Sequence, residues 1–241
     1  VDVKFSGLAW FKNEGFYYSS YDKPTGSELS AKTDQHKLYY HKLGTAQKTD
    51  KVIFGDTTKR RYVGGYVTSD QKYLVITTAN ATSGNELYLQ DLTKANAPIV
   101  TVVTGFENDY SVIDSKDGKL YIVTNYQAPN KKLVVADVAD VATRSSWKDV
   151  IPETENVLDL SKAGGYFFAH YMKDAVSVVS QFDYKGTLVR NIQLPGLGTA
   201  SGFGDKKEAK ELYYSFTNYI TPGTIYKMDI ATGKSAVFQQ P

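Results

Sequence analysis

Cysteine is absent from this 241-residue chain. Its absence excludes disulfide bonds and thiolate metal sites, and it leaves the compartment open because a chain without cysteine suits either side of a membrane. Long apolar runs are also lacking, since none approaches the roughly 18 to 20 residues that span a bilayer. We therefore expect no membrane-spanning helix and no membrane partner.

An excess of charge of one sign is lacking as well. The chain carries 28 lysine and arginine residues against 26 aspartate and glutamate residues, which gives a formal net charge of +2. A nearly balanced chain lacks the electrostatic footprint of a nucleic-acid-binding protein, so no nucleic acid is expected as a partner. The sequence has no glycine-rich phosphate loop and no clustered metal-ligand motif, and we expect no cofactor and no metal.

A signal peptide and an initiating methionine are missing from the start of the chain, which begins at Val1. This start favours a processed product, an excised domain or an engineered chain over a complete gene product. The chain itself carries no targeting segment from which a location could be predicted.

Tyrosine is abundant, with 19 residues, and it recurs in a repeated pattern of aromatic and β-branched strands. The last copy, 211–233, reads as two strands joined by a loop at Pro222 and Gly223. Equivalent residues of successive copies are Tyr17, Leu74, Tyr121, Phe167 and Tyr213 in one strand, and Tyr39, Tyr88, Val134, Val178 and Tyr226 in the next. A repeat of about 40 to 50 residues that carries four strands is typical of a β-propeller blade.

The repeat predicts an all-β fold, a five-bladed β-propeller of four-stranded antiparallel blades in one domain over 1–241. The expected blades are 1–56, 57–105, 106–155, 156–196 and 197–241. Small residues in the first strands, such as Gly64 and Gly65, support a radial arrangement, because inner strands converge where space is least. Closure into a ring and an open arc are both compatible with the sequence. An open arc would favour self-association through bare apolar faces of the terminal blades.

No catalytic residue is predicted. His36, His41 and His170 show neither a spacing of four nor an HExxH motif, so we expect structural or surface roles for them. The nucleophile motif G-x-S-x-G is absent, because GTASG at 198–202 is one residue out of register.

Three aspartates near first strands, Asp109, Asp159 and Asp205, are candidates for a glycosidase site, which needs two carboxyl groups roughly 5 to 9.5 Å apart. This hypothesis is the weaker one, because most aspartates occupy predicted turns. Those turn aspartates are Asp70, Asp117, Asp137, Asp183 and Asp229. The basic run Lys59–Arg61 is expected to be a solvated loop.

Five long stretches resemble the propeller domain of prolyl oligopeptidases, and of the bacterial enzymes in particular. They occur in family order and span nearly the whole chain. The stretches are VKFSGLAW (Val3–Trp10), KLYYHKLGT (Lys37–Thr45), VTNYQAPN (Val123–Asn130), WKDVIPE (Trp147–Glu153) and YYSFTNYITPG (Tyr213–Gly223).

The resemblance implies a function in a larger enzyme. In that family a seven-bladed propeller covers an α/β-hydrolase domain with a Ser-Asp-His triad, and it filters substrates by size. This chain is similar to the later five blades only, so the first two blades and the catalytic domain are expected to be missing. Phe5 matches a substrate-pocket aromatic of the family, and Val63 and Ala81 match further wall positions.

The leading hypothesis is therefore a non-catalytic propeller fragment, excised or engineered as a scaffold, whose parent is a serine peptidase of the bacterial periplasm or cytoplasm. The expected partner in the parent is the α/β-hydrolase domain. The alternative is a propeller module that binds a small molecule or a glycan through its loops.

Overall fold

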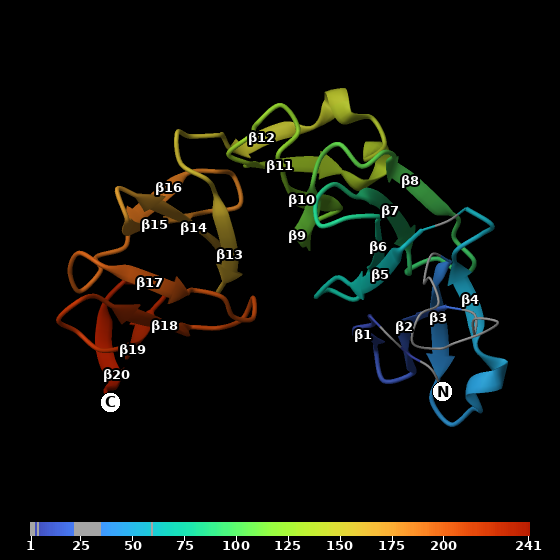
Figure 1. Ribbon diagram of the computed structural model, residues 1–241, viewed down its shortest axis with the longest axis horizontal. Helices are drawn as coiled ribbons and strands as arrows, with labels where there is room; N and C mark the ends of the chain where they lie inside the picture. Colours follow the sequence, from blue (N-terminus) through green and yellow to red (C-terminus); the bar gives the residue numbers. More distant parts are fainter. Residues whose placement is uncertain (1–2, 4, 22–34, 59) are drawn as a thin grey trace. The chain divides into compact units, whose positions relative to one another are not determined.

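Five four-stranded sheets make up the fold, and each is built from four strands that follow one another in the chain (Figure 1). The structure, a computed structural model, describes residues 3, 5–21, 35–58 and 60–241. The predicted all-β class with four-stranded antiparallel blades is confirmed. We call the five sheets blades one to five in chain order.

The strands of the first three blades are short and consecutive. Blade one contains β1 (Leu8–Phe11), β2 (Gly15–Tyr21), β3 (His36–Lys42) and β4 (Lys51–Phe54). Blade two contains β5 (Tyr62–Val67), β6 (Tyr73–Ala79), β7 (Glu86–Asp91) and β8 (Ile99–Val103). Blade three contains β9 (Tyr110–Lys116), β10 (Lys119–Thr124), β11 (Lys132–Asp137) and β12 (Lys148–Ile151).

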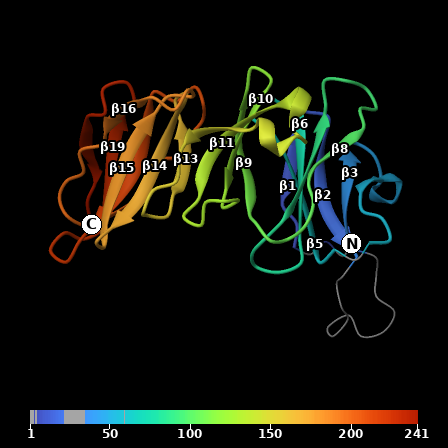
Figure 2. The ribbon, with the colours of Figure 1, turned by 90° about the horizontal axis from the view of Figure 1, so that it is seen from above.

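The last two blades follow the same plan, and Figure 2 shows β13, β14 and β15 side by side. Blade four contains β13 (Asp159–Ala163), β14 (Tyr166–Lys173), β15 (Val176–Phe182) and β16 (Leu188–Asn191). Blade five contains β17 (Thr199–Gly202), β18 (Glu211–Thr217), β19 (Thr224–Asp229) and β20 (Ser235–Gln239). The helices in the described residues are three 3₁₀ turns, η1 (Gln47–Thr49), η2 (Val138–Asp140) and η3 (Arg144–Ser146). None of them is long enough to cross a bilayer.

Aspartate and glycine form the turns between strands. Asp117 and Gly118 connect β9 to β10 with φ angles of 51° and 73°, the left-handed pair that a tight two-residue hairpin requires. The Asp183 carboxylate accepts the backbone N–H groups of Lys185 and Thr187, and Asp229 accepts that of Thr232. The predicted turn role is confirmed for these three aspartates.

The chain forms two compact units. One comprises Val1–Ile122 and Ala136–Trp147, and the other comprises Val123–Val135 and Lys148–Pro241. We describe the interior of each unit by itself. The organisation of 1–241 as one domain with the blade limits given above stays a prediction.

The core of the first unit lies between blades one and two. Its buried members are Ala9, Tyr17, Leu38, Val63, Leu74, Ile76 and Tyr88. A Cβ atom on Gly65 would lie 2.8 Å from Leu38 Cδ2, so a larger residue at this first-strand position would displace the core. At Gly65 the neighbouring blade thus favours a small residue, whereas a Cβ atom on Gly64 would meet only Thr77 Oγ1, at 3.6 Å.

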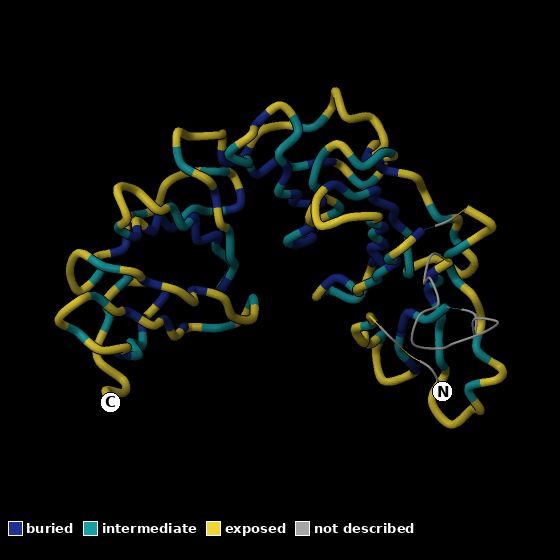
Figure 3. The backbone as a smooth tube through the Cα atoms, in the orientation of Figure 1, coloured by how far each residue is buried: buried dark blue, intermediate teal, exposed yellow. Residues whose placement is uncertain are grey.

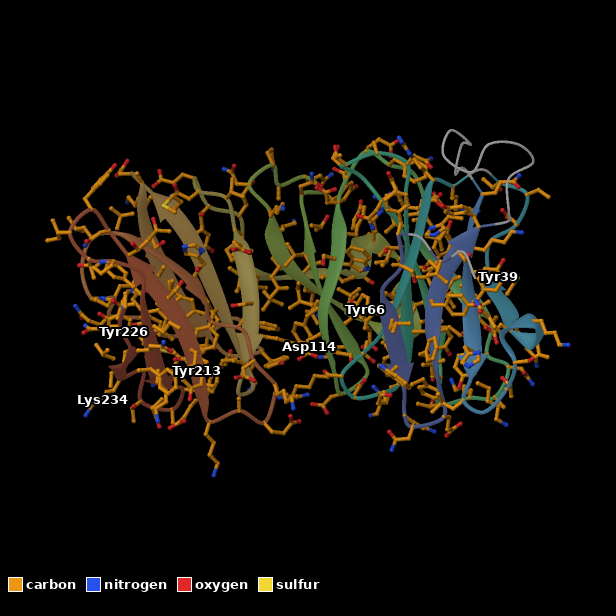
Figure 4. All side chains as sticks on the ribbon, turned by 60° about the horizontal axis from the view of Figure 1, so that its bottom comes forward. Tyr39, Tyr66, Asp114, Tyr213, Tyr226 and Lys234 are labelled. Carbon is orange, nitrogen blue, oxygen red and sulfur yellow. The ribbon has the colours of Figure 1, made fainter. Side chains whose placement is uncertain are left out.

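The contact between blade two and strand β9 is polar. The Tyr66 hydroxyl donates to the Val112 carbonyl, and the Ser69 hydroxyl lies 3.1 Å from Asp114 Oδ1. Figure 4 labels Tyr66 and Asp114. Burial, and after it the Asp114 charge, raises the pKa of Tyr66, so the hydroxyl stays protonated and remains a donor.

The core of the second unit lies between blades four and five and combines aromatic with aliphatic side chains. The rings of Phe203 and Tyr214 stack with centroids 4.6 Å apart, with Phe168 at 6.2 Å from Phe203 and Tyr226 at 5.3 Å from Tyr214. Phe168, Phe203 and Tyr214 are at most 1% exposed. In Figure 3 the buried residues run along the strands and the exposed ones gather in the loops.

Strand β18 has one buried and one exposed face. Leu212, Tyr214 and Phe216 are buried and alternate with exposed residues, as expected for a half-buried strand. Tyr213 pairs with Lys227 while Tyr214 pairs with Tyr226, so Tyr213 and Tyr226 lie on opposite faces of the sheet (Figure 4).

On its other face, blade one carries exposed apolar side chains beside the ion pair of His41 and Asp50, whose nearest atoms lie 2.8 Å apart. Leu8, Trp10 and Val52 are 62%, 50% and 50% exposed, and Trp10 contacts Phe16 on the same face. Self-association through the faces of the terminal blades stays a prediction; it would involve this surface and the exposed apolar residues of blade five, such as Val237 and Phe238.

Candidate functional site

Phe5 is an exposed aromatic residue in a costly backbone conformation. Its φ angle is 54°, which is unfavourable for a bulky residue, and its surface is 58% exposed. Its ring meets that of Tyr62 edge to face, with centroids 5.5 Å apart. Phe203 has a similar φ angle of 66° and is buried in a core, so the strain of Phe5 points to a binding site only together with its exposure.

Arg61 and Asn80 extend this contact. The Arg61 guanidinium lies over the Tyr62 ring at 5.6 Å from its centroid, and the Arg61 backbone N–H donates to Asn80 Oδ1 at 3.0 Å. Ala81 follows Asn80 in the exposed connection between β6 and β7. We name Phe5, Arg61, Tyr62, Asn80 and Ala81 the Phe5 cluster.

The three sequence-predicted residues do not share one environment. Phe5 and Ala81 belong to the exposed Phe5 cluster. Val63 is 1% exposed, with its side chain in the core between blades one and two, and its N–H donates to His36 Nδ1 at 2.9 Å. The buried side chain of Val63 is thus not part of the exposed surface of the cluster.

The sequence did not single out Tyr62, Arg61 or Asn80 for this site. Phe5 and Tyr62 are distant in the chain but precede or begin the first strands of adjacent blades. Alignment of the repeats was the signal that could have found them, because it places both residues at the same end of their blades.

A buried ionic network lies next to the cluster. The prediction of a solvated loop is wrong for Arg60, which is 9% exposed, while Lys59 lies outside the described residues. Arg60 Nε lies 3.2 Å from Glu86 Oε2, and its Nη1 lies 2.9 Å from Asp56 Oδ1. Thr78 and Tyr88 donate their hydroxyl groups to the same Glu86 oxygen at 2.6 and 2.9 Å.

This network keeps its carboxylates ionised. Burial opposes ionisation of Glu86, but hydrogen bonds from Thr78, Tyr88 and Arg60 outweigh it and lower the pKa of Glu86. Hydrogen bonds from Thr58, with a smaller contribution from Arg60, lower the pKa of Asp56. The network therefore fixes Arg60, whereas the neighbouring Arg61 is exposed.

Blade four holds a serine, a histidine and an aspartate in the order of a hydrolase triad. His170 Nε2 lies 2.8 Å from Ser177 Oγ, and His170 Nδ1 lies 3.7 Å from Asp159 Oδ2. Ser177 is only 4% exposed, and its Oγ already accepts the Ala200 N–H at 2.9 Å. The histidine–aspartate distance also exceeds that of a hydrogen bond. The group joins blade four to β17 and is not arranged for nucleophilic attack.

Replacing Ser177 with alanine tests this structural role. The change leaves the buried Ala200 N–H and the His170 ring without their partner, so we expect a loss of about 1 to 3 kcal/mol of unfolding free energy in urea titrations. The control is Ser201→Ala, which removes an exposed hydroxyl that contacts Ser215, with an expected change of about 0.5 kcal/mol or less. Equal stability of the two variants would contradict the role.

The carboxylates of the other two glycosidase candidates accept hydrogen bonds from backbone N–H groups. Asp109 Oδ1 accepts the Gly84 N–H at 2.7 Å, and Asp205 Oδ1 accepts the Lys206 N–H at the same distance. Within the residues that the structure describes, no group of three histidine or acidic side chains is placed to hold a metal ion.

Comparison with known proteins identifies the family of the chain. The model of the prolyl oligopeptidase N-terminal β-propeller domain matches residues 1–241. The chain belongs to this family. Among curated prolyl endopeptidases, the propeller is 54% identical to that of Elizabethkingia meningoseptica over all of this chain and 34% of the relative, and 26% identical to that of Dictyostelium discoideum over 99% of this chain.

Solved members of the prolyl oligopeptidase family share the fold. A prolyl endopeptidase from a study of inter-domain dynamics in catalysis superposes with a TM-score of 0.86 at 29% identity, covering 98% of this chain and 35% of that one. Prolyl oligopeptidase B of Galerina marginata, bound to a 35-residue substrate, gives 0.85 at 25% identity and covers 99% of this chain and 34% of that one. The propeller chain thus spans about a third of the length of these relatives.

Proposed function

We propose that this propeller controls the access of peptides to the active site of a prolyl endopeptidase and performs no bond cleavage itself. The observation that carries the proposal is the exposed Phe5 cluster in a member of this peptidase family. The serine–histidine–aspartate group of blade four has no accessible nucleophile, which supports a non-catalytic role.

Phe5 and Ala81 are the residues that we propose to contact the peptide, whereas the Val63 side chain is buried. Phe5 and Tyr62 form an edge-to-face pair, and the exposed Phe5 ring offers an apolar surface to a proline ring, as the aromatic grooves of proline-binding modules do. The edge-to-face contact fixes the Phe5 ring before the peptide arrives, which lowers the entropic cost of binding.

The proposed partner is an α/β-hydrolase domain. The relatives are prolyl endopeptidases and prolyl oligopeptidases about three times as long as the matched region, so a larger part of each accompanies its propeller. We infer that the same partner completes the site of which the Phe5 cluster forms one wall.

A binding and turnover experiment on this chain tests the proposal. We expect no hydrolysis of a proline-directed chromogenic peptide, and weak saturable binding of an uncleaved proline peptide that shifts the Phe5 and Tyr62 ring signals in NMR spectra. Phe5→Ala should weaken this binding about two- to tenfold, because one aromatic contact contributes about 0.5 to 1.5 kcal/mol.

The matched control is Phe238→Ala, which removes a phenylalanine of similar exposure, 59%, on blade five. Hydrolysis by the chain alone would contradict the non-catalytic role. Equal loss of peptide binding in both variants would contradict the assignment of Phe5.

A further inference from the structure

We propose that Arg61 makes the Phe5 cluster a site for peptides in which a carboxylate lies beside a proline or another apolar residue. This inference deepens the proposed function and rests on it. The positions that the family resemblance indicates, Phe5, Val63 and Ala81, are all apolar, whereas Arg61 would let the same surface recognise a negative charge.

The four arginines of the chain differ in what their guanidinium groups contact. Arg60 is held by Glu86 and Asp56, Arg144 donates to the Tyr110 hydroxyl, and Arg190 donates to the carbonyls of Ile230 and Ala231. Arg61 is exposed and stacks on Tyr62. Among the described residues, no carboxylate or carbonyl accepts a hydrogen bond from its guanidinium group.

The position of Arg61 is fixed although its donors are uncommitted. Its backbone is fixed by Asn80 and by the start of β5, and the guanidinium lies against the Tyr62 ring. Stacking on an aromatic face leaves the in-plane N–H groups free to bind another group.

The ligand class follows from these donors and from the neighbouring rings. A guanidinium group binds a carboxylate through two parallel hydrogen bonds, a geometry that an ammonium group cannot reproduce. The Tyr62 ring lies against the guanidinium group and the Phe5 ring meets Tyr62 edge to face, so an apolar ring or methyl group of the ligand can pack on Phe5. A peptide with a free C-terminal carboxylate, or with an acidic side chain, next to its apolar residue satisfies both parts.

The test compares three peptides on the wild-type chain at low salt. They are acetylated alanyl-proline as the free acid, the same peptide as the amide, and an amide that carries a glutamate after the proline. We expect the free acid or the glutamate peptide to bind about two- to fivefold tighter than the amide, the range that exposed charge pairs give, and this preference to shrink at high salt. The tighter of the two identifies the source of the carboxylate.

Two variants isolate the contribution of Arg61. Arg61→Gln should abolish the preference for the charged peptides over the amide, whereas Arg61→Lys should retain part of this preference. The matched control is Lys51→Gln, which removes the same charge from an exposed residue of β4 and should leave the preference intact. Unchanged unfolding curves verify that the variants fold.

The outcomes separate this inference from the proposed function. If the ring signals of Phe5 and Tyr62 shift equally with all three peptides, or if Arg61→Gln keeps the preference, the role of Arg61 is overturned and the proposed function stands. If no peptide shifts those signals, both are overturned.

Discussion

Replacing Phe203 with alanine is expected to lower the unfolding free energy by about 3 to 5 kcal/mol, the usual loss for a fully buried phenylalanine. Phe203 is 1% exposed and lies between Phe168 and Tyr214 in the core of blades four and five. The variant loses both the apolar burial and the stacking, and the rigid strands around it cannot collapse into the space. Urea-induced unfolding followed by tyrosine fluorescence measures the effect.

The control for Phe203 is Phe238→Ala. Phe238 lies edge to face with Tyr213 on the exposed side of blade five and is 59% exposed, so its loss should cost well under about 1.5 kcal/mol. A Phe203 variant no less stable than the Phe238 variant would mean that the aromatic core does not hold the two blades together.

Replacing Arg60 with methionine is expected to cost about 3 to 5 kcal/mol, since the change leaves the buried Glu86 carboxylate without its cation. The double variant Arg60→Met with Glu86→Leu should recover part of this loss, because it removes both charges together, although the buried Thr78 hydroxyl then loses its acceptor. Thermal and urea unfolding of the single and double variants measure the coupling. Additive losses would contradict the proposed pairing.

The same network gives stability a defined pH dependence. The folded-state pKa of Glu86 lies below its ordinary value of 4.5, because its hydrogen bonds outweigh the opposing effect of burial. Such a group stabilises the fold fully above its unfolded pKa, and the contribution is lost as the pH falls through the folded value. Glu86→Gln should therefore lose less stability than the wild type between neutral and acidic buffer.

The repeat was sufficient to predict the fold because each blade repeats the same local pattern. Tyr17 and Tyr88 lie in the predicted middle strands. The turn at Asp117 and Gly118 lies at the position that its aspartate and glycine predicted. These features depend on residues close in sequence. The start of the first strand was less predictable, since β1 begins only at Leu8, after Phe5.

The candidate site was predictable only in part. Phe5 and Ala81 came from the family resemblance, but Val63 faces the core, and no local pattern gives the side to which its side chain points. Arg60 resembled a solvated residue because its partner Glu86 lies 26 residues away. The contact between His170 and Ser177 likewise depends on the pairing of β14 with β15, and a sequence motif does not reveal this pairing.

The use of consecutive strands in every sheet also bears on how the chain is made. The four strands of each sheet are synthesised in succession, so a sheet can form without a strand from a distant, later part of the chain. Pairings between neighbours in the chain form fast, and chains fold from the N-terminus during translation. A nascent chain therefore exposes about one unfinished sheet at a time, and this limits the period in which aromatic strands such as β18 are open to aggregation.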